Sequence, residues 1–381
     1  MLRRLVASYR LSMRTLRVPE LAASDAFLCV RLAAINFLLN LSIETSAVFL
    51  PLYAIGMGAS ELQVGFIVAS YGMSFFVSSL VFGRQSDIHG RVAFVRLGLG
   101  LSALAYGLQI VATNPLTLLV ARAFVGLCLG ICSAAMTAYV YDVGSRMGRF
   151  ISYGSLGWLF GAIAAAILRD YHILFVASGL ASALAFVFSL TLEELAVSRV
   201  RVALLPVSLL RSNIRVYLPF FIRQMGAQAV WAVFPLFLAG IGASRTWIAV
   251  LSAINMGGQF LAMRFVDRFD PARMVVLGLA LSVVVFAAYG FSTNYLQFVP
   301  VQVLLSIAWS CLFIGSLTFL LRKNVERGSA AGLLYSATNL STGLGPVMGG
   351  AISQAWGFSA LMFVASGLAL TGLLASRGLR E

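Results

Sequence analysis

Long apolar stretches follow one another along this chain of 381 residues and limit what it can fold into. Each is roughly 20 residues long, enough for an α-helix to cross the hydrocarbon core of a bilayer. Hydrophobic residues make up 60% of the sequence and charged residues only 10%, which excludes an ordinary soluble domain. We predict an all-α membrane protein with twelve transmembrane helices, at about 26–55, 62–82, 92–112, 116–140, 150–168, 173–192, 215–240, 246–265, 273–291, 295–321, 329–353 and 357–376.

The net charge of +14 raises the question of a nucleic-acid partner, and the positions of the charges answer it. Of the 27 Lys and Arg residues, 22 fall in segments that would share one side of the membrane. Arg169 and Arg245 fall on the other side, and Arg31, Arg122 and Arg223 lie within predicted spans. This asymmetry follows the positive-inside rule, so we predict two cytoplasmic termini and no nucleic-acid partner.

The two sets of six spans look like copies of one unit. Pro51–Ser60 (PLYAIGMGAS) matches Pro235–Ser244 (PLFLAGIGAS) at an offset of 184, and FVASGL at 175–180 recurs at 363–368. A duplicated six-helix unit accounts for both matches. The predicted divisions are a cytoplasmic or interfacial segment 1–24, an N-terminal six-helix bundle 25–192, a cytoplasmic linker 193–214 and a C-terminal six-helix bundle 215–381.

Cysteine and histidine give no sign of a metal site or an enzyme. The two histidines, His89 and His172, lie outside the spans, and no nucleophile–base pair or metal-ligand spacing occurs. We therefore expect no cofactor, no metal and no enzymatic activity. The four cysteines lie in apolar runs, where this residue usually acts as a small hydrophobe: Cys29, Cys128, Cys132 and Cys311.

A polar stripe in the first span is the strongest candidate site. Asn36, Asn40 and Glu44 stand at i, i+4 and i+8, so a helix places them on one face. A carboxylate in the hydrocarbon costs at least about 2.5–3.5 kcal/mol on insertion scales, so Glu44 should face the protein interior or a water-filled cavity. The offset of 184 carries Asn40 onto Gln224 and Glu44 onto Gln228, which gives the seventh span a neutral counterpart of the stripe.

Two buried arginines have several possible roles. Helical rise places Arg122 about 10 Å and Glu44 about 17 Å from the outer ends of their spans, which allows the two side chains to come within salt-bridge reach. Arg223 lies about 12 Å into the seventh span. It is a counter-ion for Glu44, a binding site for an anionic substrate, or a structural residue whose side chain extends to the cytoplasm.

Further polar and aromatic residues are candidates for lining a central cavity. They are Trp231 in the seventh span, Trp309 in the tenth, and Tyr335 with Asn339, spaced i, i+4, in the eleventh. The alternative for the aromatic residues is packing or contact with lipid.

The loop between the second and third spans carries the pattern G-x-x-x-D-x-x-G-R. It reads GRQSDIHGR and contains Gly83, Asp87, Gly90 and Arg91. Glycine permits a tight turn and close helix approach, Asp87 suits the positive end of a helix, and Arg91 can pair with a carboxylate. At this loop the chain resembles the major facilitator superfamily, and the resemblance extends over the twelve spans, the 6+6 repeat and the central linker.

The resemblance implies a cytoplasmic latch. Asp87 would meet the start of the eleventh span near Ser329, and Asp142 at the end of the fourth span would be available to Arg91. These contacts would hold the cytoplasmic side closed. The alternative is that the loop sets topology and charge without gating.

Two glycine-containing stretches also look like family motifs. Arg122 with Gly126 and Gly130 is similar to a motif in which the buried arginine serves proton coupling, although the glycines suit helix packing. The fifth span keeps the glycines of a drug/proton antiporter motif at 154–161 but lacks its proline. The fuller match, GLGPVMGG at 343–350, lies in the eleventh span, and this departure weakens the assignment to drug exporters.

The hypothesis that combines these features is a proton-coupled secondary transporter working by alternating access. Glu44 would exchange protonation against pairing with Arg122 or Arg223. We expect export of small lipophilic or cationic compounds, by a monomer in the lipid bilayer of the cell membrane with protons as the coupling ion. The alternatives are a proton-coupled symporter or exchanger of a small organic anion and, from another class, a non-transporting membrane sensor.

Overall fold

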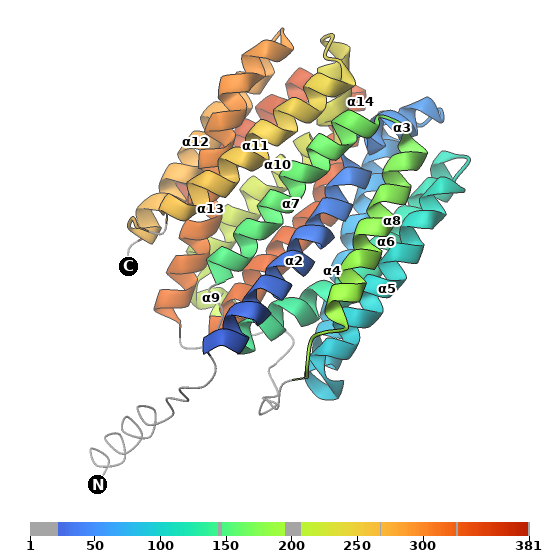
Figure 1. The fold of residues 1–381 in the computed structure, drawn as a ribbon. Helices are drawn as coiled ribbons and strands as arrows, with labels where there is room; N and C mark the ends of the chain where they lie inside the picture. The colour runs from blue at the N-terminus through green and yellow to red at the C-terminus, as the bar shows by residue number, and fades with distance from the viewer. Residues whose placement is uncertain (1–21, 144–146, 195–206, 267, 325–326, 380–381) are drawn as a thin grey trace.

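The structure is a computed structural model that describes residues 22–143, 147–194, 207–266, 268–324 and 327–379. All regular secondary structure in these ranges is helical, as predicted (Figure 1). Most of the predicted cytoplasmic or interfacial segment 1–24 and most of the predicted linker 193–214 lie outside the described residues.

The first half of the chain forms seven of the described helices. They are α2 (Ala22–Ala47), α3 (Leu50–Gly56), α4 (Glu61–His89), α5 (Arg91–Ile110), α6 (Pro115–Asp142), α7 (Met147–Leu168) and α8 (Tyr171–Ser189). The predicted first span is divided between α2 and α3. The division lies just before Pro51, which occupies the first turn of α3, where its missing amide hydrogen leaves no helical bond unmade, whereas its repeat equivalent Pro235 lies inside the continuous helix α10.

The second half adds the remaining described helices. They are α9 (Val207–Ser212), α10 (Ile214–Gly240), α11 (Arg245–Val266), α12 (Pro271–Phe291), the 3₁₀ turn η1 (Tyr295–Gln297), α13 (Phe298–Lys323) and α14 (Arg327–Ala375). At 49 residues, α14 would be roughly 70 Å long if straight, about twice the thickness of the hydrocarbon core. It is divided at Gly357, whose φ of 83° is non-helical, so α14 supplies two crossings.

The count of spans agrees with the prediction. Eleven described helices are long and apolar enough to cross a membrane, and the last of them contains two crossings. The internal repeat is also visible in the backbone. Gly58 and Gly242 both have φ of 86°, and the amides of Ala59 and Ala243 each donate to the carbonyl oxygen five residues earlier, at 3.1 and 2.9 Å.

Each half is a bundle of helices held by its own contacts. In the first half α2 packs on α7 and α8, α5 packs on α6 and α8, and α4 packs on α6. In the second half α12 packs on α13 and α14, α11 packs on α13, and α10 packs on α14. Two helix pairs make most of the contacts between the halves, α4 with α14 and α7 with α11, and α10 makes smaller contacts with α3 and α4.

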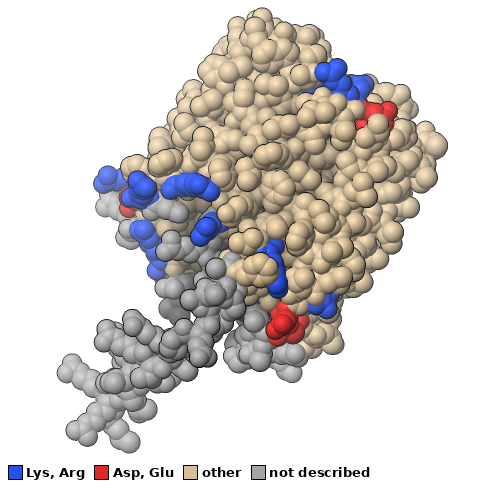
Figure 2. Space-filling model, viewed as in Figure 1, with Lys and Arg blue, Asp and Glu red and all other residues tan. Residues whose placement is uncertain are grey.

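Charge distinguishes the two ends of the molecule. Lys and Arg side chains gather where α2 begins and the C-terminus lies, and a broad belt without charge separates them from a small charged group at the other end (Figure 2). We call the first the basic end and the second the opposite end. Arg169 and Arg245 lie at the opposite end, where α7 ends and α11 begins.

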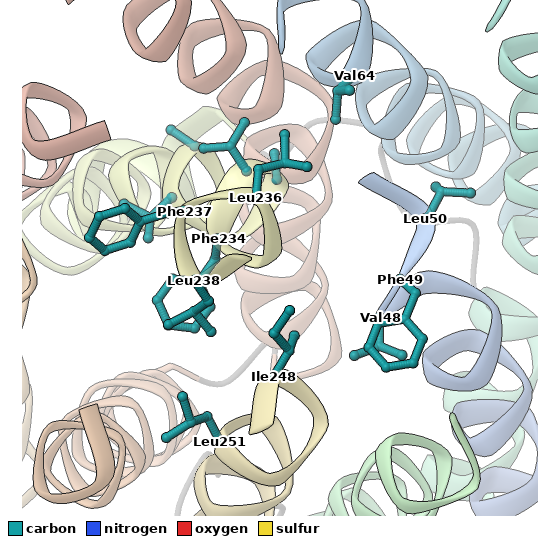
Figure 3. Packing of buried hydrophobic residues seen from close by; sticks show 14 of the residues in the cluster. Val48, Phe49, Leu50, Val64, Phe234, Leu236, Phe237, Leu238, Ile248 and Leu251 are labelled. Atoms are coloured by element: carbon teal, nitrogen blue, oxygen red, sulfur yellow. The ribbon is translucent and has the colours of Figure 1, made fainter. Parts of the chain in front are cut away.

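The hydrophobic core is shared between the halves only toward the opposite end. One cluster combines buried residues from 48–175 with buried residues from 227–369; Figure 3 shows Phe49 and Leu50 on one side of it, Phe234 and Leu238 on the other, and Ile248 between them. A second cluster contains buried residues of the first half alone, and a third contains those of the second half alone. Ile151, partly buried, contacts both of these. The halves are thus most firmly joined at the opposite end.

Candidate functional site

The polar stripe of the first span lies between α2 and α7. Asn36 is 6% exposed and donates from Nδ2 to the carbonyl oxygen of Phe150 on α7, at 2.7 Å. Asn40 donates from Nδ2 to Oδ1 of Asn36, at 2.9 Å. These bonds fix the stripe against α7, so Asn36 acts in helix packing here rather than as an open cavity wall.

The glycines of the fifth span make this approach possible. A side chain on Gly157 would collide with the carbonyl oxygen of Phe37, and a Cβ on Gly161 would lie 2.7 Å from Cβ of Glu44. Gly154 faces the stripe one turn earlier. The antiporter-like glycines therefore bring α7 against α2 at the level of the carboxylate, and α7 is helical from Met147 to Leu168.

Glu44 itself is half-buried. Its carboxylate makes no hydrogen bond or ion pair with any residue that the structure describes. Its two oxygen atoms are also not among the fully buried polar atoms that lack a hydrogen-bond partner. Of the 13 Asp and Glu residues in the sequence, it is the one that lies deep within a span. A carboxylate without a partner, in contact with a helix of the same half, is free to bind a proton or a cation.

Arg122 binds α2 but does not pair with Glu44. Its Nη1 donates to Oγ of Ser46 at 3.3 Å, and its guanidinium lies 4.7 Å from the centre of the Tyr71 ring. Only 3% of Arg122 is exposed. The predicted salt bridge is absent in this conformation because positions two apart on a helix project about 200° from one another. Arg122 reaches the face of Ser46, and Glu44 faces α7.

The seventh span reproduces this geometry with neutral groups. A Cβ on Gly345 of α14 would lie 2.7 Å from Cβ of Gln228, as one on Gly161 would from Glu44. The other atoms that these two glycines approach also correspond at the offset of 184. Gln224 is buried and accepts a hydrogen bond from the neighbouring Arg223.

Arg223 is enclosed within the second half. It is 2% exposed, and Nε donates to Oγ of Ser282 at 2.9 Å while Nη1 donates to Gln224 at 3.0 Å. The guanidinium also lies 5.4 Å from the ring centre of Phe286 and 5.5 Å from that of Trp309. Two predicted roles do not fit this position: Arg223 neither pairs with Glu44 nor extends to the cytoplasm. Its Nη2 has no partner among the described residues.

Replacing Arg223 by methionine should leave the protein folded with an unchanged or higher melting temperature. A buried charge without a counter-ion is costly, and its removal leaves no opposite charge unpaired. Thermal unfolding of the detergent-solubilised variant provides the measurement. A melting temperature lowered by more than about 8 °C would show instead that the hydrogen bonds of Arg223 are needed for stability.

The predicted aromatic cavity residues divide into two groups. Trp309 stacks on Phe313 at 5.1 Å between ring centres, and Tyr335 meets the same ring edge-on at 5.8 Å. Trp231 contacts Phe234, at 5.2 Å, on the side of the shared core. Trp309 thus lies beside Arg223, and Trp231 packs against the shared core. Asn339 is half-buried on α14.

The loop between α4 and α5 is organised by a residue from the predicted linker. Glu194 accepts hydrogen bonds from the backbone amides of Arg91 and Val92, at 2.7 and 2.8 Å, and so caps the start of α5. Gly90 has φ of 105°, and a Cβ there would lie 3.0 Å from Oε2 of Glu194. Gly83 approaches Ala134 of α6, where a Cβ would lie 3.2 Å away.

The ion pair expected from the resemblance is present, but it lies within one half. Nη1 of Arg91 is 2.6 Å from Oδ2 of Asp142, and the two residues belong to α5 and α6. This pair therefore joins helices of the first half and does not by itself close the halves against each other. The side chains of Asp87 and Ser329, which the latch also requires, lie outside the described residues.

Polar contacts at the opposite end join the halves and were missed from the sequence. Arg245 of α11 donates to the carbonyl oxygen of Arg169 at 3.2 Å and lies 4.6 Å from the ring centre of Tyr171. Arg169 in turn donates to Oγ1 of Thr246 at 3.2 Å. The charge count had assigned both arginines to one side of the membrane, but only the tertiary structure brings them together.

The contact of α4 with α14 depends on glycine. Side chains on Gly65 and Gly72 of α4 would collide with the backbone carbonyls of Pro346 and Thr342. One on Gly350 of α14 would collide with the backbone of α4. The GLGPVMGG stretch thus has one side against α10 of its own half and another against α4 of the other half.

Metal chemistry finds no support in the described ranges. Among these residues, no three His, Cys, Asp or Glu side chains come together in a group that could hold a metal ion.

The chain resembles transporters in sequence. The quinolone resistance protein NorA of Staphylococcus aureus (strain MSSA476) is 22% identical over 362 residues, covering 89% of this chain and 92% of NorA. The multidrug resistance protein MdtG of Salmonella paratyphi B (strain ATCC BAA-1250 / SPB7) is 26% identical over 370 residues, covering 84% and 87%. The chain is thus a relative of multidrug transporters at low identity.

Solved structures share the fold. The nucleoside transporter NupG gives a TM-score of 0.74 at 14% identity, over 92% of this chain and 98% of that one. The human organic anion transporter MFSD10 gives 0.76 at 16%, over 93% and 99%. The sequence profile described as Major Facilitator Superfamily matches residues 32–244 and 216–380. This multi-pass cell membrane protein therefore belongs to the major facilitator superfamily of transporters.

Proposed function

We propose that the protein is a proton-coupled secondary transporter that exports small lipophilic or cationic compounds by alternating access. The observation that carries this proposal is the carboxylate of Glu44, deep in the first span and without a partner among the described residues. Such a group binds either a proton or a cationic substrate, and competition between the two couples their movements.

The two arginines support a role for Glu44 as the exchangeable group. Arg122 is bonded to Ser46 and Arg223 to Ser282, so neither neutralises Glu44 in this conformation. Since Arg122 binds the same helix two residues away, a change in the tilt of α2 would alter its distance from Glu44. Arg122 is then the counter-charge that favours loss of the proton in another state of the cycle.

The distribution of the cores favours the alternating-access part of the proposal. The halves share a hydrophobic core toward the opposite end and keep separate cores toward the basic end. If the basic end faces the cytoplasm, as the positive-inside rule predicts, this arrangement corresponds to a state closed to the outside. Rocking of the halves would part the α4–α14 and α7–α11 contacts and close the basic end.

Export of lipophilic or cationic compounds is proposed from the chemistry of the site and from the relatives. An acidic group on one helix face with the amides of Asn36 and Asn40, in a chain with long apolar helices, suits a cation with apolar surface. NorA and MdtG are named for quinolone and multidrug resistance.

A second candidate, transport of a small organic anion, rests on the arginines. Nε of Arg122 and Nη2 of Arg223 are buried donors without a partner in the described part of the chain. A substrate carboxylate would satisfy either of them. The difficulty is access, since both side chains are at least 97% buried.

Flux through reconstituted protein distinguishes these functions. Liposomes containing the full chain should accumulate tetraphenylphosphonium when a pH gradient is imposed, and not when the gradient is collapsed. Uptake of benzoate, abolished in Arg223→Ala, would favour the anion transporter. Absence of gradient-driven movement of any tested compound would contradict the proposed function.

A further inference from the structure

A basic pocket opens at the basic end of the second half, away from the candidate site. Its volume is about 230 Å³, and it lies between the start of α10, the end of α13 and the residues that follow α14. The side chains that matter most are those of Arg211, Arg215, Phe319, Lys323 and Leu379.

The pocket has a strongly positive character. Three of its lining residues are cationic, Arg211, Arg215 and Lys323, and none of the described lining residues is acidic. All three are exposed, and Nζ of Lys323 is held 5.3 Å above the centre of the Phe319 ring. Cationic groups that converge on a pocket favour an anion with several acceptor oxygens.

The start of α10 adds to this field. Asn213 precedes the helix but makes no side-chain capping bond; its Nδ2 donates instead to neighbouring oxygen atoms. No acidic residue occupies the first turn. The positive end of this 27-residue helix therefore has no acidic residue in its own first turn and lies at the wall of the pocket.

An apolar groove adjoins the basic pocket and shares Leu379 with it. The groove has a volume of about 550 Å³ and follows α12, where Val276 and Leu277 are 38% and 41% exposed. Asp270 and Arg273 lie at its end nearest the start of α12, where Asp270 caps the helix by accepting from the amide of Arg273 at 2.7 Å. Beyond them the groove wall is aliphatic.

We propose that the pocket and groove together bind one anionic phospholipid of the cytoplasmic leaflet. The phosphate occupies the basic pocket, and an acyl chain lies in the groove along α12. A phosphate alone would account for the three cations, but only a lipid uses the adjoining apolar groove as well. The position also suits a lipid, because basic pockets beside membrane helices on the cytoplasmic side match anionic headgroups.

This site has a mechanical consequence. The pocket joins the end of the predicted linker, through α9 and the start of α10, to α13 and to the residues after α14. A lipid bound there would hold the connection between the halves against the second half. Anionic lipid should therefore stabilise the second bundle as well as bind to it.

Thermal unfolding of the full-length protein in a neutral detergent tests the proposal. Dioleoylphosphatidylglycerol should raise the melting temperature at lower concentrations than dioleoylphosphatidylcholine does, because binding to the native state stabilises it. Substituting Arg211, Arg215 and Lys323 together by glutamine should weaken the apparent affinity for phosphatidylglycerol by about tenfold or more, since each cation near an anionic headgroup contributes.

Two further variants keep the test decisive. Glutamine at Arg149, Arg264 and Arg268 removes the same charge from the basic end outside the pocket and should leave the lipid effect unchanged. Ala280→Trp narrows the groove without altering a charge. Unlike the control triple, it should abolish the stronger stabilisation by phosphatidylglycerol than by phosphatidylcholine. If the variant with Arg211, Arg215 and Lys323 replaced does not fold, Ala280→Trp alone tests whether the lipid binds here.

Three results would overturn the proposal. Equal stabilisation by the two lipids would show that the protein does not recognise the anionic headgroup. An equal loss of affinity for phosphatidylglycerol in the control triple variant would show a general effect of charge and not a site. Glycerol 3-phosphate that reproduces the full shift, with Ala280→Trp having no effect, would identify a site for a soluble phosphate compound instead.

Discussion

Glu44→Gln is expected to abolish substrate movement driven by a pH gradient while leaving the protein folded. Glutamine keeps the size and polarity of the side chain but cannot exchange a proton. Because Glu44 has no partner among the described residues, its replacement leaves no opposite charge unpaired, and the melting temperature should change little. Loss of function without loss of stability separates a coupling role from a structural one.

The measurement is accumulation of tetraphenylphosphonium in liposomes with an imposed pH gradient, comparing the wild type with Glu44→Gln. We expect accumulation to fall to the level of empty liposomes. Gln228→Asn is the matched control, because Gln228 has the same geometry against Gly345 but does not titrate. Gradient-driven accumulation should persist in that variant, even if its affinity changes. Retention of coupling in Glu44→Gln would remove Glu44 from the mechanism.

Gly72→Val is expected to shift the protein away from the state described here and to open the opposite end. The valine side chain would collide with the backbone of Thr342 across the contact between α4 and α14. Backbone cannot move aside as a flexible side chain does, so overpacking should cost about 1–3 kcal/mol in this state alone. That range corresponds to a roughly five- to 150-fold shift toward conformations in which the halves part.

Spin labels report this shift directly. Thr113→Cys and Thr293→Cys place labels in exposed loops of the two halves at the opposite end. In Gly72→Val the distribution of distances between the labels should move to longer values, and transport should fall because the closed state is disfavoured. Gly107→Val is the control, since a Cβ at Gly107 has no heavy atom within 4 Å. An unchanged distribution in Gly72→Val would show that this contact does not hold the end closed.

The fold was largely predictable because long apolar runs leave few alternatives in a bilayer. Twelve crossings, the 6+6 repeat and the equivalence of Gly58 with Gly242 all follow from patterns along the chain. Local breaks were harder to foresee. The first span is divided between α2 and α3 just before Pro51, although the equivalent Pro235 lies inside the continuous helix α10, and Gly357 separates two crossings within α14.

The sequence predicted which residues of the candidate site share one helix face, but not which side chains they contact. Helical periodicity correctly placed Asn36, Asn40 and Glu44 on one side of α2. The predicted pairing of Glu44 with Arg122 rested on their similar depth in the membrane, and depth does not give the direction in which a side chain projects. In the structure Arg122 bonds to Ser46 instead. Likewise, the internal position of Arg223 depends on Ser282, which lies 59 residues away in sequence.

The latch illustrates a different limit. The resemblance indicated that Arg91 and Asp142 would be near each other, and they are paired at 2.6 Å. Only the packing of α5 on α6 shows that this pair lies inside one half. The contacts that do cross between the halves involve backbone carbonyls and glycines, which carry little sequence signal before the partner helix is known.

Proton release on substrate binding tests the central claim most directly. Tetraphenylphosphonium is added to purified protein in weakly buffered detergent solution, and the change in pH is recorded. If Glu44 holds either a proton or the cation, linkage requires the wild type to release up to about one proton per bound molecule and Glu44→Gln to release none. Equal release from the two proteins would contradict the assignment of Glu44 as the coupling group.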